Sequence, residues 1–553
     1  MARLVNQPES AVGGVTGRAQ PSRPRTRRPG GRFFFFLLPL ALYLGAGAYL
    51  NLITHAIVGD AWSRAGNAYY VLFSRDPHLA AIGFVWNPLP SLLEMPLVLL
   101  HDLWPPLITQ GYAACILSAL SMAGAVYLLR GTLRDWNVPW LARDAITILF
   151  ALHPMIVEYG ADGDSEAVWL LLLLLTIRSF SRWIRDDDTA SLAITGIGIA
   201  LAYMVRYEAG AIAIVAVGLV VPATYHRTSG TTKARLVAGV ADALVAGTPF
   251  AVAFVGWAIA SYLIVGNPFE QFSSAYGTTS QLKADSGLAA HLGQGVSAIP
   301  WVLAQVGSLE PALFLLALLA LMVAVIRRDP RVLAPLCLLG AVLAFAGFVY
   351  ATGRTGGWMR YYITAVPLAC LLAGILLARP VRLPGLPPAG RRWIPGIVRG
   401  LAALATIASI AVALPVATWA MYNTTLGTGE QDQANQTAAY RQGELVASAI
   451  DGMNLGRGSV LVDVFMGFPV VLESSNPTQF VITPDRDFKP TVAAPDSFDV
   501  RYLLVPEPTG LATLDALNHQ WPGIYQDGAG IGKLVREFPA LPGTPAWRLY
   551  AVR

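Results

Sequence analysis

Long apolar segments, separated by short polar connections, recur along most of this chain. A transmembrane helix needs about 20 predominantly apolar residues to cross the hydrocarbon of a bilayer. About eleven segments approach that length: 33–56, 107–129, 140–158, 165–183, 189–205, 207–225, 238–265, 306–326, 332–351, 360–379 and 398–420. The pattern predicts a polytopic α-helical membrane protein with about eleven spans.

Basic residues are distributed very unevenly between alternate connections. The N-terminal tail and every second connection after it hold 24 arginines and lysines, whereas the opposite connections up to residue 421 hold six. Cytoplasmic connections carry an excess of Lys and Arg, so we expect the N-terminus to be cytoplasmic. With an odd number of spans, the C-terminal segment then lies outside the cytoplasm, in a multi-pass integral plasma membrane protein.

Composition divides the chain into three parts. Residues 1–32 form a basic tail rich in Pro and Gly that is predicted to be disordered, residues 33–421 form the membrane body, and residues 422–553 form a soluble outer domain. An amphipathic helix is expected at 432–452. Short apolar runs predict strands at 459–464, 479–483, 502–506 and 547–552. The outer domain is therefore predicted to be mixed α/β, and no phosphate loop or nucleophile elbow marks it as a catalytic centre.

Two outer connections are longer than a link between spans requires. The first, 57–106, is rich in aromatic residues and prolines, and its apolar part, 89–100, is too short to cross a membrane. We interpret that part as an interfacial or re-entrant helix. The second, 266–305, is rich in Gly, Ser and Gln. Long loops of this kind commonly serve as lids or binding loops.

Composition also excludes several classes of protein. Of the 553 residues 55% are hydrophobic and 13% charged, with a mean hydropathy of +0.52, which excludes an ordinary soluble protein. The formal net charge of +5 reflects the basic connections, so nucleic acid is not expected as a partner. Cys115, Cys337 and Cys370 all fall in predicted spans, which argues against disulfides in the outer domain, thiol catalysis and a cysteine metal site.

Ionisable residues in or beside spans are costly and commonly functional, and here they gather on the predicted outer side. Asp60 follows the first span, and we expect it to be the catalytic base. Ten more side chains are candidates for substrate binding: His153, Asp162, Asp164, Glu166, Arg206, Glu208, Arg354, Arg360, Tyr361 and Tyr362. No metal ligand set is expected, because three carboxylates without a defined frame are weak evidence for one.

Each candidate also has a purely structural explanation. Asp60 could be a solvated loop acid, and the acids at 162–166 could cap the following helix. Arg206 and Glu208 could pair with each other or with lipid phosphates. Arg360 could extend to a lipid headgroup, and His153 could be a satisfied interior histidine.

At these residues the membrane body, 33–379, resembles a known family. The features that carry the likeness are an acidic residue early in the first outer connection, the segment Trp86-Asn87-Pro88-Leu89, the run from His153 to Glu166, and Arg360-Tyr361-Tyr362 followed by Pro367. They are similar to those of GT-C glycosyltransferases that use polyprenyl-phosphate sugars, in particular the branch that resembles protein mannosyltransferases and aminoarabinose transferases. The resemblance implies that Asp60 is the general base and that Arg360 contacts the donor phosphate. Two departures are that Asp60 is followed by Ala61 rather than a second acid, and that Asn87-Pro88-Leu89-Pro90 replaces the usual Pro-Pro-Leu-Tyr-like segment.

The resulting hypothesis is a membrane glycosyltransferase, a hexosyl- or pentosyltransferase, that needs no cofactor besides its lipid-linked donor. Arginines would neutralise the leaving phosphate, a carboxylate would accept the proton of an acceptor hydroxyl, and direct attack would invert the anomeric carbon. The acceptor could be a glycan, a lipid or a protein. Two alternatives are a transporter or flippase of envelope lipids or glycans, and a non-catalytic envelope-assembly protein.

Overall fold

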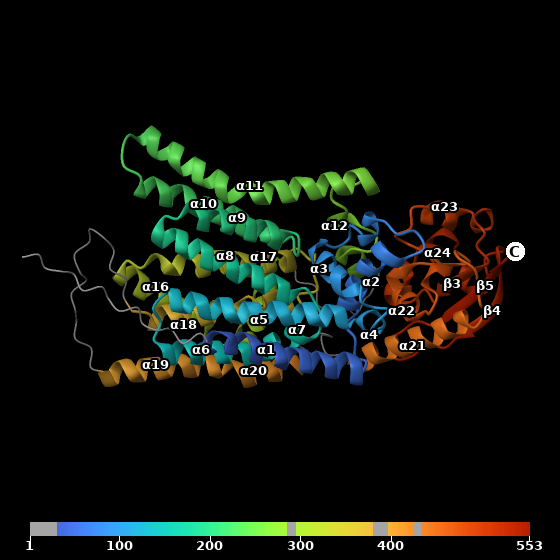
Figure 1. Cartoon of the computed structure of the whole chain (residues 1–553), viewed down its shortest axis with the longest axis horizontal. Coiled ribbons are helices and arrows are strands. Elements are labelled where there is room, and N and C mark those ends of the chain that lie inside the picture. Colours follow the sequence, from blue (N-terminus) through green and yellow to red (C-terminus); the bar gives the residue numbers. More distant parts are fainter. Residues whose placement is uncertain (1–29, 285–294, 380–395, 424–432) are drawn as a thin grey trace, which may run out of the picture.

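The structure is a computed structural model that describes residues 30–284, 295–379, 396–423 and 433–553. Its helices lie side by side in an elongated bundle, and the C-terminal domain sits at one end of that bundle (Figure 1). Most of the predicted tail, residues 1–29, falls outside the described residues, as does the link 380–395, which holds several of the basic residues counted above.

Every apolar segment predicted to span the membrane is helical. The helices of the body are α1 (Gly30–Gly47) continued by η1 (Ala48–Ile53), α5 (Tyr112–Asp135), α6 (Trp140–Leu152), α7 (Pro154–Ala161), α8 (Glu166–Asp186), α9 (Thr189–Tyr203), α10 (Ala209–Arg227), α11 (Thr232–Val265), α15 (Ile299–Leu309), α16 (Leu313–Arg327), η4 (Pro330–Val332), η5 (Ala334–Leu339), α17 (Gly340–Ala351), α18 (Ala365–Leu377), α19 (Gly396–Ala411) and α20 (Ala413–Met421).

Ten of the eleven predicted spans are long and apolar enough to cross a membrane, and the eleventh is a shorter helix. The described residues contain eight helices that are long and apolar enough to cross a membrane, or ten if each bent pair counts as one span. The remaining predicted segment, 189–205, forms α9, which has only 15 residues. At 1.5 Å per residue such a helix is about 22 Å long, shorter than the roughly 30 Å of bilayer hydrocarbon.

Two spans are bent. Helices α6 and α7 meet at an angle of 57° beside His153-Pro154, and α15 and α16 meet at 82° around Glu310-Pro311. Proline ends a helix because it lacks a backbone N–H donor and clashes with the preceding turn. Helix α7 lies nearer than α6 to the end of the bundle that faces the C-terminal domain (Figure 1).

The first long connection, residues 57–106, is mostly helical. It forms α2 (Gly59–Phe73), η2 (Leu79–Ile82), α3 (Leu89–Val98) and α4 (Pro106–Thr109). Asp60 therefore lies in the first turn of a helix, not in a loop as expected. The second connection forms α12 (Glu270–Ser273), α13 (Thr278–Ala284) and η3 (Gly295–Ala298), and η6 (Met359–Tyr362) precedes α18.

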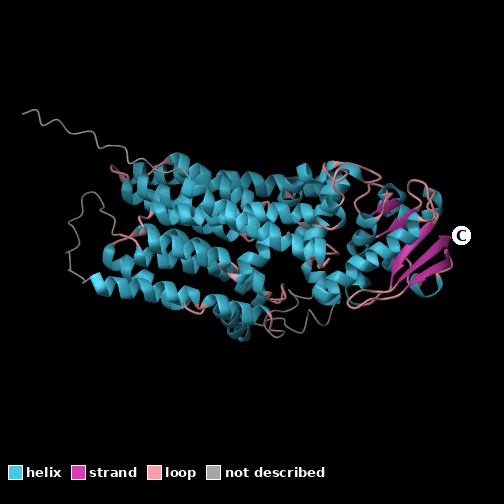
Figure 2. Ribbon diagram, turned by 60° about the horizontal axis from the view of Figure 1, so that its bottom comes forward, coloured by secondary structure: helices cyan, strands magenta, loops and turns pink. Residues whose placement is uncertain are grey.

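The C-terminal domain has the predicted mixed α/β architecture (Figure 2). Its elements are α21 (Gln433–Asp451), β1 (Val460–Val462), α22 (Val464–Glu473), η7 (Pro477–Gln479), β2 (Phe480–Ile482), α23 (Phe488–Ala493), η8 (Pro495–Phe498), β3 (Tyr502–Pro506), η9 (Gly510–Leu514), α24 (Ala516–Gln520), α25 (Ile524–Asp527), β4 (Gly532–Phe538) and β5 (Trp547–Val552). The strand order is β2-β1-β3-β5-β4; β1 runs parallel to β2 and β3, and β5 is antiparallel to β3 and β4.

Strand β4 was not predicted from the sequence. It is an edge strand whose five central residues are exposed, so it lacks the apolar alternation that marks a half-buried strand. The four predicted strands, in contrast, are largely buried.

The domain and α2 share one apolar core. Trp62 and Ala65 of α2 belong to the same buried cluster as Val470 and Leu472 of α22. The Trp62 ring lies edge-on to the Phe468 ring, with 5.5 Å between the ring centroids. The helix that carries Asp60 is thus packed directly against the C-terminal domain.

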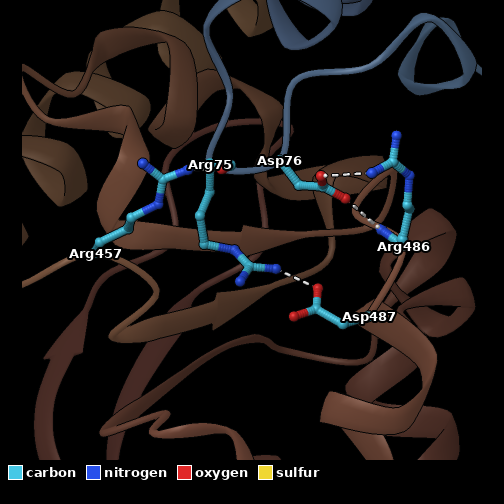
Figure 3. A pocket seen from close by; sticks show the side chains of 5 residues that line it. All are labelled: Arg75, Asp76, Arg457, Arg486 and Asp487. Atoms are coloured by element: carbon cyan, nitrogen blue, oxygen red, sulfur yellow. Dashed lines mark hydrogen bonds and ion pairs between the residues drawn. The ribbon is translucent and has the colours of Figure 1, made fainter.

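Ion pairs reinforce this junction (Figure 3). Arg75 donates to Asp485 (3.0 Å) and also pairs with Asp487, while Arg486 approaches Asp76 at 3.4 Å. Together with Arg457, four of these residues line a cavity of about 320 Å³. The position of α2 is therefore fixed at both of its ends, by the membrane body and by the C-terminal domain.

Candidate active site

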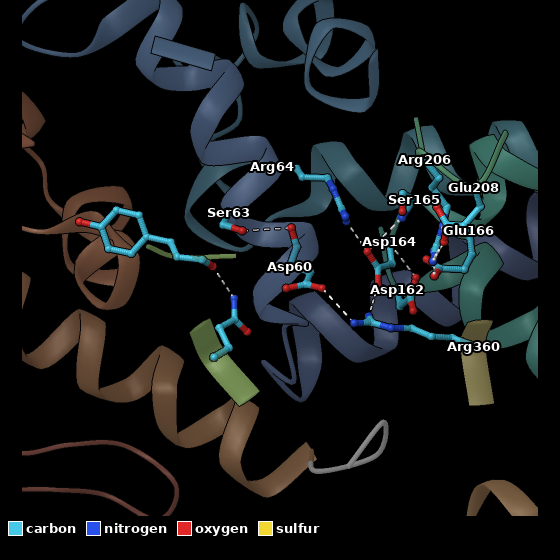
Figure 4. Close-up of polar contacts among 12 residues, drawn as sticks. Asp60, Ser63, Arg64, Asp162, Asp164, Ser165, Glu166, Arg206, Glu208 and Arg360 are labelled. Atoms are coloured by element: carbon cyan, nitrogen blue, oxygen red, sulfur yellow. Dashed lines mark hydrogen bonds and ion pairs between the residues drawn. The ribbon is translucent and has the colours of Figure 1, made fainter. Parts of the chain in front are cut away.

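Asp60 lies at the N-terminus of α2, where the helix dipole and free backbone N–H groups favour a negative charge. Its side chain is 39% exposed. The Arg360 guanidinium, which comes from η6 at the start of α18, donates to Asp60 Oδ2 at 3.1 Å (Figure 4). The structure thus brings together two candidate residues that are 300 positions apart in the sequence.

Asp164 joins the same arginine from the opposite side. Its Oδ2 accepts from Arg360 at 2.6 Å, and its Oδ1 accepts from Arg64, which lies one turn after Asp60 on α2. The Asp164 side chain is 1% exposed and the Arg64 side chain 11%. Four charged side chains from α2, η6 and the turn before α8 thus form a continuous chain: Asp60, Arg360, Asp164 and Arg64.

The turn that presents Asp164 depends on a glycine. Gly163 has φ +90°, and a Cβ there would lie 2.9 Å from the Ala114 Cβ and 3.1 Å from the Ala61 Cβ. A side chain at 163 would therefore be strained and would collide with α5 and α2. The turn is closed by the Asp164 N–H, which donates to Asp162 Oδ1 at 2.8 Å.

The two aspartates of this turn have opposite pKa shifts. Burial raises the pKa of Asp162 well above its ordinary value, and the negative charge of Asp164 adds to the effect. Burial also acts to raise the pKa of Asp164, but the guanidinium groups of Arg64 and Arg360 outweigh it and hold that pKa at about 2. Asp164 is therefore the charged partner of the two arginines.

A second ion pair lies beside the first. Arg206, in the turn between α9 and α10, pairs with Glu166 at the start of α8 and donates to Glu208 Oε1 at 2.7 Å. Tyr361 links the two groups, because its ring lies under both Arg206 and Arg360, at 5.1 and 5.7 Å from the ring centroid. Arg206 and Glu208 do pair with each other, as the structural explanation expects. Arg206 also pairs with Glu166, another of the candidate residues.

Helix capping does not account for the acids at 162–166. The residue that caps α8 is Ser165, and its side chain makes no capping hydrogen bond. Asp164 does accept from the Ser165 N–H at 3.0 Å, but its remaining bonds go to arginines of distant elements.

The other candidates lie apart from this cluster. His153 is buried at the bend between α6 and α7, where its Nε2 donates to the Leu309 carbonyl at 3.2 Å. Tyr362 is fully buried in the apolar core of the bundle, and Arg354 is exposed in the turn after α17. A role for these three side chains in substrate binding stays a prediction.

Two charged residues of the cluster were not predicted. Arg64 follows Asp60 by four positions, and residues at that spacing share one face of a helix, so the pair could have been recognised once α2 was assigned. Glu94 is the lone acid in the apolar segment that forms α3, which is the signal that could have identified it. It is 1% exposed, and neither carboxyl oxygen has a hydrogen-bond partner among the described residues.

The environment of Glu94 gives a testable pH dependence. Burial raises the pKa of Glu94 to about 8, against the opposing pull of the Arg64 charge. The buried acid therefore favours the folded state most below its ordinary pKa near 4.5, and this contribution is lost as the pH rises toward 8. We expect Glu94→Gln, which stays neutral, to gain stability over the wild type between pH 5 and 8, by up to about 1.4 kcal/mol per pH unit.

The measurement is the thermal unfolding midpoint of the purified protein across that pH range. Asp496→Asn is the control, because Asp496 is exposed on η8 and its substitution also removes one carboxylate. The stability of Asp496→Asn should follow that of the wild type across the pH range. If the stability of Glu94→Gln also follows the wild type at every pH, Glu94 does not behave as an isolated buried acid.

The cluster contains a carboxylate and a guanidinium side by side. Together these are the groups required to transfer a substituent from a lipid phosphate to a hydroxyl. A half-exposed carboxylate on a rigid helix can accept a proton, and the guanidinium beside it can hold a phosphate oxygen. Among the described residues, no three His, Cys, Asp or Glu side chains are arranged to hold a metal ion. Catalysis without a metal stays a prediction.

Comparison with known proteins connects this geometry to one fold. No protein-family model matches the chain, and no curated protein matches it. The solved structure of ArnT from Cupriavidus metallidurans, bound to undecaprenyl phosphate, has a TM-score of 0.52 and 14% sequence identity, over 95% of this chain and 98% of that one. The archaeal oligosaccharyltransferase AglB from Archaeoglobus fulgidus, in complex with an inhibitory peptide and a dolichol-phosphate, has a TM-score of 0.44 and 12% identity, over 93% of this chain and 74% of that one.

The chain is therefore a polytopic membrane protein with a GT-C-like fold and a C-terminal mixed α/β domain. The likeness to ArnT extends over nearly the whole of both chains, so it includes the C-terminal domain as well as the bundle. The resemblance drawn from short motifs of the body is thus confirmed at the level of the fold.

Proposed function

We propose that this protein is a glycosyltransferase that moves a sugar from a polyprenyl-phosphate donor to an acceptor hydroxyl, with inversion at the anomeric carbon. The observation that carries the proposal is the contact between Arg360 and Asp60, 3.1 Å, at the half-exposed end of an otherwise buried chain of charges. The fold shared with ArnT, which was solved with undecaprenyl phosphate, supports the same donor chemistry.

The proposed reaction divides the work between these residues. Asp60 accepts the proton of the acceptor hydroxyl as its oxygen bonds to the anomeric carbon, while the bond from that carbon to the phosphate oxygen breaks. The leaving polyprenyl phosphate takes the bonding electrons, and Arg360 neutralises the charge that develops on it. Asp164 and Arg64 hold Arg360 in place, so it can turn from Asp60 to the phosphate without losing its buried partner.

The proposal also includes an orientation. The N-terminus lies in the cytoplasm, and the site and the C-terminal domain lie outside it. This orientation is supported by the basic connections between α5 and α6, between α8 and α9 and between α10 and α11, which lie at the other end of the bundle from that domain (Figure 1). An assay must test different sugars and different acceptors. The sugar is a hexose or a pentose, and the acceptor is a glycan, a lipid or a protein.

The test is release of polyprenyl phosphate by the purified protein in lipid nanodiscs. A panel of polyprenyl-phosphate hexoses and pentoses is offered with and without acceptors, and the anomeric configuration of the product is determined by NMR. Acceptor-dependent release with an inverted product is expected. No turnover with any polyprenyl-linked sugar would refute the proposal and favour a transport or assembly function.

One observation favours transport as a second candidate. The two bent spans meet at their bends, where His153 contacts Leu309, and both carboxyl oxygens of the adjacent buried Glu310 have no partner among the described residues. Broken helices with ionisable groups inside the bundle are common in transporters. The test is movement of a lipid-linked sugar across the membrane of proteoliposomes that contain the protein. If this movement occurs without sugar transfer and Glu310→Gln abolishes it, the protein is a transporter instead.

A further inference from the structure

A junction cavity lies between α2 and the C-terminal domain, apart from the groups of the proposed reaction. Its volume is about 320 Å³, which is within the range of sites that bind small molecules. The side chains that line it are all charged: Arg75, Asp76, Arg457, Arg486 and Asp487 (Figure 3). A hollow with this lining and no apolar wall is a candidate site for a polar ligand.

The central arginine of the junction cavity is held in place by the protein. Arg75 is 17% exposed, and it donates from Nε to the buried Asp485 at 3.0 Å. Its Nη2 pairs with Asp487, and its backbone carbonyl accepts from Arg457. The loop before β1 packs against its stem, because a Cβ at Gly458, which has φ +70°, would lie 3.2 Å from the Arg75 Cδ. Arg75 therefore loses little freedom when a ligand binds.

Much of the hydrogen-bonding capacity of the junction cavity is unused. The Arg457 guanidinium contacts the Arg75 carbonyl, but it has no carboxylate partner among the described residues. Arg486, whose side chain is 68% exposed, approaches Asp76 only at 3.4 Å. Arg75 binds one carboxylate oxygen of Asp487, and the other accepts no hydrogen bond within the described part of the chain. The cavity therefore presents guanidinium donors and carboxylate acceptors to a ligand at the same time.

This combination selects the chemistry of the ligand. Guanidinium groups only donate hydrogen bonds and carboxylates only accept them, whereas a hydroxyl does both. With Asp485 behind Arg75, three arginines and three aspartates balance, so no net charge favours an ion. An apolar chain would remove water from these charges without replacing its hydrogen bonds. A sugar ring, with several hydroxyls on a compact frame, satisfies both kinds of group.

A peptide fits the lining less well than a sugar. It has one backbone donor and one backbone acceptor per residue, and its side chains need pockets that this lining does not supply. The chemistry of the cavity therefore favours a glycan over the other acceptor classes.

We propose that the junction cavity binds a sugar unit of an acceptor glycan, at a distance from the unit that receives the transferred sugar. The acceptor role rests on the proposed function, whereas the affinity for sugar does not. Helix α2 joins the two places, because Asp60 lies in its first turn and Arg75 follows its last residue, Phe73, by two positions. At 1.5 Å per residue its 15 residues are about 22 Å long. One sugar ring does not extend over that distance, so an acceptor that uses both places is an oligosaccharide.

Arg457→Met removes one guanidinium from the cavity and keeps the ion pairs of the junction, which Arg75 and Arg486 make. The probes are hexasaccharides of glucose, mannose, galactose and arabinose. Binding to the full-length protein in nanodiscs is measured by isothermal titration calorimetry, without donor. We expect a hexasaccharide to bind the wild type and Arg457→Met to weaken it about tenfold, the loss typical of removing a charge-assisted hydrogen bond. Arg486→Met should act in the same direction.

Arg536→Met is the matched control. Arg536 is exposed on β4, at the opposite edge of the sheet from β2, and Arg486 follows β2. This substitution should leave the affinity unchanged. The unfolding midpoint of each variant shows whether it is folded.

A kinetic measurement tests the acceptor role. In the transfer assay, Arg457→Met should raise KM for the hexasaccharide that binds and leave kcat unchanged. The reason is that a contact far from the reacting atoms is equally strong in the ground state and in the transition state.

Three results in the binding assay would overturn the inference. They are no binding of any hexasaccharide to the wild type, unchanged affinity in folded Arg457→Met and Arg486→Met, and an equal loss in Arg536→Met. Binding of a Gly-Ser hexapeptide that Arg457→Met weakens would assign the cavity to a peptide instead.

The acceptor role has its own contrary result. Sugar binding that Arg457→Met weakens, with KM unchanged, would overturn that role. Calorimetry is done without donor, so failure of the proposed enzymatic function is seen separately, as absence of polyprenyl phosphate release.

Discussion

Asp60→Asn is expected to lower kcat for sugar transfer by about 10²–10⁴-fold, the range typical of losing a positioned general base. Asparagine is nearly isosteric with aspartate but cannot accept the proton of the acceptor hydroxyl. The fold should survive, because Asp60 is 39% exposed and Arg360 keeps its ion pair with the buried Asp164. Rates are measured with the donor that the panel assay identifies, and folding by the unfolding midpoint.

Asp76→Asn is the control for this experiment. Asp76 lies just beyond the other end of α2 and pairs with Arg486 of the C-terminal domain at 3.4 Å, so it carries a similar charge without facing Arg360. Its kcat should equal that of the wild type. An Asp60→Asn enzyme that retains turnover within a few-fold of the wild type would remove Asp60 from the role of base.

Asp164→Asn should have the largest effect on stability. The substitution leaves Arg64 and Arg360 without their shared buried carboxylate, and breaking a buried ion pair in this way costs about 3–5 kcal/mol. Because the pKa of Asp164 in the folded protein is about 2, below its ordinary value of 3.8, its contribution is present above pH 4 and is lost as the pH falls toward 2. The difference in unfolding midpoint between the wild type and Asp164→Asn should therefore be large at pH 7 and should shrink in acid.

Asp162→Asn provides the comparison within the same turn. Burial raises the pKa of Asp162, so its neutral form is favoured, and an asparagine Oδ1 can still accept from the Asp164 N–H. We expect a much smaller change in the unfolding midpoint than for Asp164→Asn. Equal losses in the two variants would show that the charge of Asp164 is not what stabilises the site.

Local sequence patterns predicted most of the fold. The apolar segments all form helices, and Tyr502–Pro506 and Trp547–Val552 form strands with the predicted ends. Such patterns succeed because the burial of a continuous or periodic apolar surface decides the backbone conformation. They failed for β4, an exposed edge strand, and they overestimated the length of α9 by two residues, because its apolar pattern continues toward the turn at Arg206.

The candidate site was predicted in part. Asp60, Asp164, Glu166, Arg206 and Arg360 were chosen because charges beside apolar spans are costly, and the structure brings them together. The pairing was not predictable, because Asp164 bridges Arg64 and Arg360 only once α2, α8 and α18 have packed. Glu94 was missed because its burial depends on the packing of α3 against α2 and α5.

The sequence by itself determined that this chain crosses a membrane many times, which residues form its spans, and which charged residues beside those spans are candidates for a site. Those properties follow from the apolar length of each segment and from the cost of burying charge, which each stretch of chain carries independently of the others. Only the tertiary structure decided that Asp60 faces Arg360, that the acids of one turn have opposite pKa shifts, and that charged side chains line a cavity between α2 and the C-terminal domain. These properties depend on distances between elements that are far apart in the sequence. The charged groups are only a few ångströms apart, so a small shift in packing would change which charge is neutralised and which space stays open.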